Sequence, residues 1–143
     1  KIIGDLSVFT PEIQRLANDA EKQLKNNNGL NLVIAANYGG QWDIAESAKK
    51  IAIKSVNGEI DPEKIDASLF HAHSSLADFP KVDLLIRTSG EVRISNFLLW
   101  EIAYSELYFC NTLWPDFDEH ELDAAIESFH SRERRFGKRN GEK

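Results

Sequence analysis

The loop from Arg87 to Ser95 (RTSGEVRIS) gathers side chains that bind anions. Arg87 and Arg93 carry guanidinium groups, which pair with phosphate oxygens through parallel hydrogen bonds. Three hydroxyl side chains and a flexible glycine accompany them in the loop. A helix predicted to begin at Ser95 or Asn96 adds unpaired amide N–H groups, which also favour negative charge. The loop therefore predicts a polyanion site, and a diphosphate fits these donors.

The same two arginines could have a structural role in place of anion binding. Arg87 and Arg93 can instead pair with Asp83 and Glu91 in an ion network, and spacing alone leaves both interpretations open. The following segment, residues 97–104 (FLLWEIAY), favours ligand binding because it is almost continuously apolar. A helix that is apolar nearly all round is buried in a core or against another subunit. We therefore expect the arginine loop to precede a buried helix.

Glu106 is the candidate metal ligand. Mg²⁺ binds one or two protein carboxylates together with substrate phosphates, and the alternative role is a surface or interface carboxylate. The acidic stretch 116–121 (DFDEHE) is interpreted as a solvated helix start. His71 and His73 face different directions on a helix and are interpreted as surface residues. Cys110 has no histidine nearby in the sequence and is interpreted as a core residue.

Helix and strand patterns alternate along the chain, which predicts an α/β fold with a parallel sheet. Thr10 and Pro11 begin an amphipathic helix that ends before Asn26. Residues 30–36 (LNLVIAA) and 82–86 (VDLLI) are apolar on both faces, as buried parallel strands are. A short third strand is predicted at 107–109, and further helices are predicted after the capping residues Asp43 and Asp118.

Ligands of open parallel sheets bind beyond the carboxyl ends of the strands. Two loops of this sequence directly follow a predicted parallel strand, residues 37–43 and residues 87–95. The second loop carries the arginines, so we expect the binding chemistry there.

The composition of the 143 residues fits one folded domain. Hydrophobic residues make up 42%, and no apolar run approaches the roughly 20 residues of a membrane-spanning helix. The net charge is −6, although the tail 132–143, with six Lys or Arg and two Glu, carries +4, so the remaining residues carry −10. An acidic body argues against nucleic-acid binding. The single cysteine agrees with a cytoplasmic location, and the absence of an initiator Met predicts a preceding segment.

Four motifs together resemble the cis-prenyltransferases, and among them the bacterial synthases of undecaprenyl diphosphate. The resemblance runs from about Ile3 to Gly137, and it implies an α/β fold with a parallel central sheet flanked by helices, whose N-terminal part is missing from this chain. Residues 1–143 are then a single domain, the carboxyl-terminal portion of such an enzyme, with a basic tail at 132–143. The motifs are NYGGQWDI (37–44), DLLIRTSGEVRISNFLLWEIAYSELYF (83–109), LWPDFDE (113–119) and RERRFG (132–137).

The resemblance implies an enzyme that condenses isopentenyl diphosphate repeatedly onto an allylic diphosphate such as farnesyl diphosphate, with Mg²⁺ as cofactor. The product would be undecaprenyl diphosphate, the lipid carrier for cell-wall synthesis. By position, Arg87, Arg93 and Ser95 match the residues that hold the diphosphate of isopentenyl diphosphate. Glu106 matches a carboxylate that helps to bind Mg²⁺, in the family often across a dimer interface.

The resemblance also implies a homodimer in which the helix after Ser95 lies at the interface. Arg135 and Gly137 match a C-terminal Arg-x-Gly element that approaches the substrate diphosphate from the neighbouring subunit. Leu30 would lie near the end of an apolar product tunnel. The expected location is the cytoplasm, with peripheral contact with the inner membrane surface for product release.

Some family features are absent or changed. The Asp-Gly-Asn-x-Arg-Trp motif, which supplies the main catalytic aspartate, does not occur, so we expect no catalytic residue in this chain and no activity of the chain alone. Val92 stands where some bacterial members have His, Gln41 replaces a common Arg, and Ser89 replaces a common Gly.

Two alternative functions remain open from the sequence. A non-catalytic partner subunit of the same fold tends to lose the arginine and glutamate positions, which this chain keeps. A generic phosphate-binding α/β module needs a glycine-rich phosphate fingerprint, which does not occur.

Overall fold

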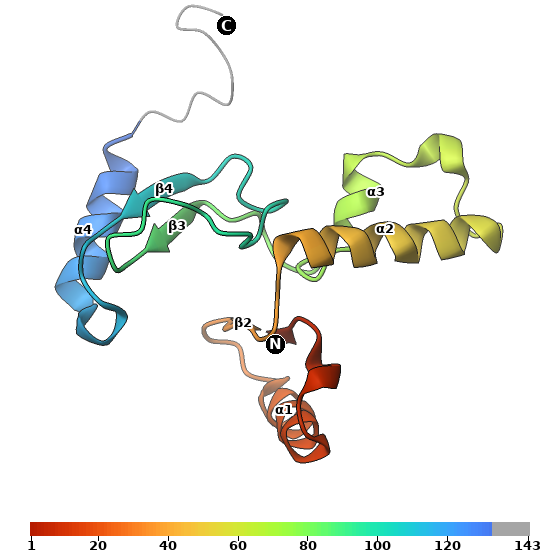
Figure 1. Cartoon of the computed structure of the whole chain (residues 1–143), viewed down its shortest axis with the longest axis horizontal. Coiled ribbons are helices and arrows are strands. Elements are labelled where there is room, and N and C mark those ends of the chain that lie inside the picture. Colours follow the sequence, from red (N-terminus) through yellow and green to blue (C-terminus); the bar gives the residue numbers. More distant parts are fainter. Residues whose placement is uncertain (133–143) are drawn as a thin grey trace, which may run out of the picture. The chain divides into compact units, whose positions relative to one another are not determined.

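The structure, a computed structural model, describes residues 1–132 and divides into two compact units, Lys1–Phe79 and the part that begins at Pro80. Each unit contains a pair of parallel strands with helices beside them in the sequence (Figure 1). The predicted α/β class with parallel strands and flanking helices is confirmed. No helix among the described residues is long and apolar enough to cross a bilayer.

The first unit pairs strand β1 (Ile2–Ile3) with strand β2 (Ile34–Ala35). Helix α1 (Pro11–Leu24) connects them, and it begins as predicted, with the hydroxyl of Thr10 accepting the N–H of Ile13 at 3.4 Å. Pro11 sits in the first turn, where its missing N–H leaves no helical bond unmade. The unit continues with helices α2 (Gly40–Val56) and α3 (Ala67–His71) and with 3₁₀ turns at Leu6–Val8 and Pro62–Lys64.

The strand predicted at 30–36 is shorter and more exposed than expected. Only Ile34–Ala35 are extended in a ladder, and Leu30 and Leu32 are 94% and 64% exposed. A strand that is apolar on both faces is buried only when layers cover both faces and strands pair with both edges. Within the described residues β2 pairs with β1 alone, so the prediction of a buried strand is wrong for this chain.

The second unit pairs strand β3 (Leu84–Arg87) with strand β4 (Glu106–Phe109), with Leu84 opposite Glu106 and Arg87 opposite Phe109. The predicted strands are confirmed with bounds shifted by one or two residues. Helix α4 (Glu119–His130) lies against β4 and begins as predicted, because the carboxylate of Asp118 accepts the N–H of Glu121 at 3.1 Å. A 3₁₀ turn at Trp114–Asp116 precedes it.

The helix predicted after Ser95 does not form. Ser95, Asn96 and Leu98 have φ angles of 42°, 63° and 44°, a left-handed region that a right-handed helix excludes. The segment is a series of turns closed by bonds such as that from the N–H of Glu101 to the carbonyl of Leu98, at 3.0 Å. Its apolar side chains are therefore not buried all round, and Tyr104 is 67% exposed.

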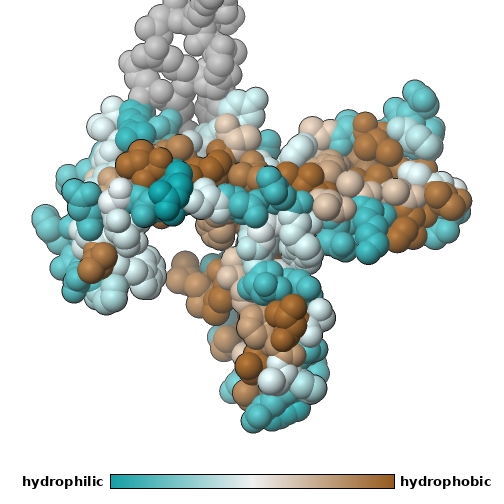
Figure 2. Space-filling model, viewed as in Figure 1, coloured by the Kyte–Doolittle hydropathy of each residue, from teal (hydrophilic) through white to brown (hydrophobic). Residues whose placement is uncertain are grey.

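Each unit has a small core of its own. Leu98 and Ile102 are buried with Leu85 of β3 and Ala125 of α4 in the second unit. In the first unit, helix α1 has no buried residue. Figure 2 shows apolar side chains, in brown, at the surface of the part that holds α1 and β2. In the first unit, the buried apolar residues are Ile3, Ile51 and Leu76.

Candidate anion-binding site

The arginine loop begins at the carboxyl end of β3, the end at which open parallel sheets bind ligands. Two backbone bonds tie its start to the segment after β4. Ser89 donates to the carbonyl of Thr112 and Gly90 to the carbonyl of Cys110, both at 2.9 Å. The base of the loop is therefore fixed by both strands of the pair.

The turn at Ser89 and Gly90 uses the left-handed backbone region twice in succession, with φ angles of 69° and 70°. Gly90 suits this conformation, and a Cβ at that position would also lie 3.2 Å from the side-chain oxygen of Asn111. Ser89 has a Cβ, which disfavours the same region by roughly 1–2 kcal/mol. The serine at position 89 is therefore in a strained backbone conformation.

The structure brings Arg87, Arg93 and Ser95 together. Nη1 of Arg87 donates to the backbone carbonyl of Arg93, and Nε of Arg93 donates to the hydroxyl of Ser95 at 3.1 Å. The sequence placed these three residues in one loop, and the hydrogen bonds show that they form one cluster. These bonds leave further guanidinium N–H groups available to an anion, because each guanidinium carries five.

Arg93 also forms an ion pair between Nη1 and the carboxylate of Glu91, as the structural alternative predicted. The two side chains are 62% and 40% exposed. Exposed pairs of this kind contribute about 0–1 kcal/mol, whereas charge-assisted hydrogen bonds to an oxyanion contribute about 1.5–3 kcal/mol. An anion can therefore displace Glu91, so this ion pair does not exclude ligand binding. Asp83, the other acidic partner expected from the sequence, does not pair with Arg87. Arg87 makes no ion pair within residues 1–132.

A helix start does not contribute to this site. The unpaired N–H groups expected near Ser95 and Asn96 depended on a helix that the structure replaces with turns. The positive charge offered to an anion in the described loop is therefore that of the two arginines.

Glu106 lies at the amino end of β4, opposite Leu84, whereas Arg87 lies at the carboxyl end of β3. Three residues of strand separate these levels, a distance of about 10 Å along the sheet. One oxygen of Glu106 accepts Nη1 of Arg132 at 3.0 Å, and the side chain is 24% exposed. Within one chain, the structure does not bring the candidate metal ligand into the arginine cluster.

Glu106 is suited to supply one of the ligands of Mg²⁺. The second carboxylate oxygen has no hydrogen-bond partner within residues 1–132, and Mg²⁺ commonly takes one or two carboxylates with substrate phosphates. No group of three or more His, Cys, Asp or Glu that could enclose a metal ion occurs among the described residues. The remaining ligands would have to come from outside this part of the chain.

A groove of about 530 Å³ opens in the first unit, between the end of α1 and the segment that leads into β2. Leu30 is one of its walls, and a set of apolar side chains shares its lining with several polar ones, among them Lys22 and Lys25. Leu30, which is predicted to lie near the end of a product tunnel, thus lines a groove that is partly apolar. The apolar lining residues are Ile2, Ala20, Leu24, Leu30, Leu32, Ile34 and Phe79.

Arg135 and Gly137, the predicted C-terminal substrate-binding residues, lie outside the described residues.

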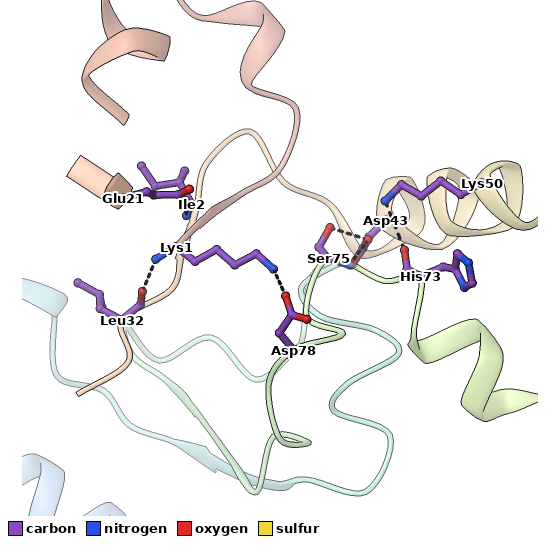
Figure 3. A network of polar contacts seen from close by, with 9 residues as sticks. All are labelled: Lys1, Ile2, Glu21, Leu32, Asp43, Lys50, His73, Ser75 and Asp78. Carbon is purple, nitrogen blue, oxygen red and sulfur yellow. Dashed lines mark hydrogen bonds and ion pairs between the residues drawn. The ribbon is translucent and has the colours of Figure 1, made fainter. Parts of the chain in front are cut away.

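Sequence reasoning missed the role of Asp43. Helix α2 begins at Gly40, so Asp43 lies in its first turn and does not cap it as expected. Asp43 is 5% exposed, and its carboxylate accepts the N–H and hydroxyl of Ser75, at 3.1 and 2.7 Å (Figure 3). The carboxylate also accepts the hydroxyl of Tyr38, at 2.9 Å. The buried network fastens residues 37–43 to the turn after α3. Ser75 is 32 residues from Asp43, a separation at which local spacing carries no information.

Comparison with known proteins gives one consistent answer. The family model described as "Putative undecaprenyl diphosphate synthase" matches residues 1–137. Two curated relatives are named ditrans,polycis-undecaprenyl-diphosphate synthase, (2E,6E)-farnesyl-diphosphate specific. That of Vibrio parahaemolyticus is 53% identical over 137 residues, which are 96% of this chain and 55% of the relative. That of Escherichia coli K12 is 49% identical over 137 residues, 96% of this chain and 54% of the relative.

Two crystal structures resemble the fold. Lavandulyl diphosphate synthase from Lavandula x intermedia, in complex with dimethylallyl diphosphate, has a TM-score of 0.93 and 41% identity over 96% of this chain and 59% of its own. A probable undecaprenyl diphosphate synthase from Campylobacter jejuni has a TM-score of 0.82 and 30% identity over 96% and 62%. The chain spans about half the length of the curated relatives that it matches.

Proposed function

The chain belongs to the undecaprenyl diphosphate synthase family of prenyltransferases, and on that premise we propose that it is the carboxyl-terminal portion of a cis-prenyltransferase. The reaction is the repeated condensation of isopentenyl diphosphate onto farnesyl diphosphate, giving undecaprenyl diphosphate for cell-wall synthesis. This chain supplies the site for isopentenyl diphosphate. The observation that carries the proposal is the cluster of Arg87, Arg93 and Ser95 at the carboxyl end of β3.

The arginine cluster acts by holding one substrate in place. Arg87 and Arg93 bind the diphosphate of isopentenyl diphosphate, and the fixed base of the loop keeps the double bond of this substrate at one position. Orientation of this kind contributes several kcal/mol to a reaction between two bound molecules. The loop is a binding device, and the proposal places no catalytic group in it.

The departing diphosphate of the allylic substrate gains negative charge as its carbon–oxygen bond breaks. Mg²⁺, when bound, stabilises that charge. Glu106 serves as one of its carboxylate ligands. Since Glu106 and Arg87 lie at opposite ends of the β3–β4 pair, we propose that a homodimer brings Glu106 of one subunit to the substrate of the other. The catalytic residue belongs to the remaining part of the protein, so this chain alone is inactive.

The growing chain is apolar and needs a dry channel. The groove beside Leu30 supports this role, because its lining is rich in apolar side chains. Each buried CH₂ contributes about 0.8 kcal/mol, so every added isoprene unit favours occupation of such a channel. In this proposal Leu30 limits the length of the product.

The same proposal includes the C-terminal residues and the location of the enzyme. Arg135 and Gly137 contribute to diphosphate binding from the second subunit. The enzyme works in the cytoplasm and contacts the inner membrane surface peripherally to release its product.

The test is incorporation of isopentenyl diphosphate by the full-length product of the gene. Arg93→Ala removes charge-assisted hydrogen bonds, each contributing about 1.5–3 kcal/mol, so we expect kcat/KM for isopentenyl diphosphate to fall about 10- to 100-fold. The loss should lie mainly in KM. Arg15→Ala is the matched control, because Arg15 also forms an exposed ion pair, with Asp19 at 3.1 Å. An unchanged KM in Arg93→Ala would contradict the assigned site.

A further inference from the structure

Arg132 connects the end of α4 to the start of β4. Its backbone N–H donates to the carbonyl of Phe129 at 3.3 Å, which continues the last turn of α4. Its side chain reaches Glu106 at the first residue of β4, with Nη1 3.0 Å from Oε2. The backbone of Glu106 is held as well, since its N–H donates to the carbonyl of Asp83 at 2.9 Å. Glu106 thus lies within β4, and Arg132 lies two residues beyond α4 and is tied to it by this backbone bond.

This ion pair differs from the surface pairs of the same chain. The Glu106 side chain is 24% exposed, whereas Asp78 and Asp19, which pair with Lys1 and Arg15, are 82% and 53% exposed. The partners are 26 residues apart, so the pair is not a by-product of helical spacing. A half-buried carboxylate with one oxygen held has a fixed orientation, while an exposed one rotates freely.

The contact leaves one carboxylate oxygen of Glu106 without a partner in the described part of the chain. Carboxylates that bind metal ions are commonly oriented by a hydrogen bond from a neighbouring group, and loss of that group typically weakens metal binding 10- to 100-fold. A simple surface pair predicts no such effect, because exposed pairs contribute little.

We propose that Arg132 is a positioning residue that holds Oε2 of Glu106, so that the other oxygen is presented to a divalent cation. The proposal rests on the proposed function, in which Glu106 is a ligand of Mg²⁺. It adds a residue at the start of the RERRFG segment to the metal site. Arg132 does not touch substrate in this role, and it acts through the orientation of Glu106.

The test is binding of Mn²⁺, which takes oxygen ligands as Mg²⁺ does, to the full-length protein, measured through the electron paramagnetic resonance of the free ion. Arg132→Ala should raise the dissociation constant about 10- to 100-fold. Arg132→Lys should recover part of the loss, because it keeps one charged donor. Arg15→Ala, which removes a matched exposed ion pair, should change it less than twofold. Thermal unfolding without metal shows whether each variant is folded.

A Glu106→Gln variant separates this inference from the function on which it rests. If Glu106→Gln weakens Mn²⁺ binding and Arg132→Ala does not, the positioning role of Arg132 is wrong and the metal role of Glu106 stands. If Glu106→Gln also leaves binding unchanged, both are wrong. Tighter binding by Arg132→Ala would show that Arg132 competes with the ion, and it would overturn the proposal.

Discussion

The loops at 37–43 and 87–95 each follow a parallel strand, yet their polar contacts differ in burial. In the first loop, Asp43 is 5% exposed, and its carboxylate accepts three hydrogen bonds from within the chain. In the second, the Arg93 side chain is 62% exposed and its ion partner Glu91 is 40% exposed. Buried, satisfied groups are costly to rearrange, whereas exposed pairs exchange partners readily. The first loop is therefore suited to support and the second to binding.

Gly4 offers the strongest test of rigidity around the first loop. It has a φ angle of 115°, and a Cβ there would overlap the carbonyl oxygen of Ala36, just before the loop. Gly4→Ala should lower the free energy of unfolding by about 4 kcal/mol or more, because backbone has to move as well as adopt a strained φ. Gly58→Ala is the control, since Gly58 has a similar positive φ of 75° in open space. Equal losses in urea unfolding would argue against a rigid contact.

Asp43→Ala should have the next largest effect. It leaves the N–H of Ser75 and two hydroxyl groups without their acceptor in a partly buried place, which should cost about 3 kcal/mol of unfolding free energy. Asp61→Ala is a suitable control, because the Asp61 side chain is 51% exposed and caps a short turn. Urea unfolding of the full-length protein measures both. A loss no larger than that of Asp61→Ala would remove the contrast between the two loops.

Ser89→Gly should stabilise the protein, by about 0.5–1 kcal/mol. Ser89 has a φ angle of 69°, at which its Cβ causes steric strain. Glycine removes that strain but increases the conformational entropy of the unfolded chain. Ser89→Ala keeps the Cβ, so it should give no gain. Thermal unfolding distinguishes the two variants. A gain from alanine equal to that from glycine would mean that the hydroxyl, and not the backbone, is responsible.

Glu91→Ala should have the smallest effect on stability, within about 0.5 kcal/mol, because its pair with Arg93 is exposed. The variant frees Arg93, so KM for isopentenyl diphosphate should not rise. Steady-state kinetics of the full-length enzyme measures it. A large rise in KM would show that Glu91 orients Arg93 and that the second loop is as fixed as the first.

The ends of helices were predictable because their signals are local. Thr10 and Asp118 accept N–H groups three residues ahead, and the sequence shows both partners within one turn. The clustering of Arg87, Arg93 and Ser95 was predictable for the same reason, since one short loop holds all three. Sequence alone thus determined where α1 and α4 begin, the alternation of helices with parallel strands, and the clustering of the three residues that we propose to bind an anion.

Tertiary structure decided the features that depend on distant partners. The apolar stretch at 30–36 has the composition of a buried strand, but a strand needs neighbours, and the described chain gives β2 only β1. The apolar segment after Ser95 has a helical pattern, but its left-handed residues fold it into turns. The bonds that Ser75 donates to Asp43 and Arg132 donates to Glu106 span 32 and 26 residues. Side chains that far apart meet only when the chain has folded, so local spacing could not reveal them.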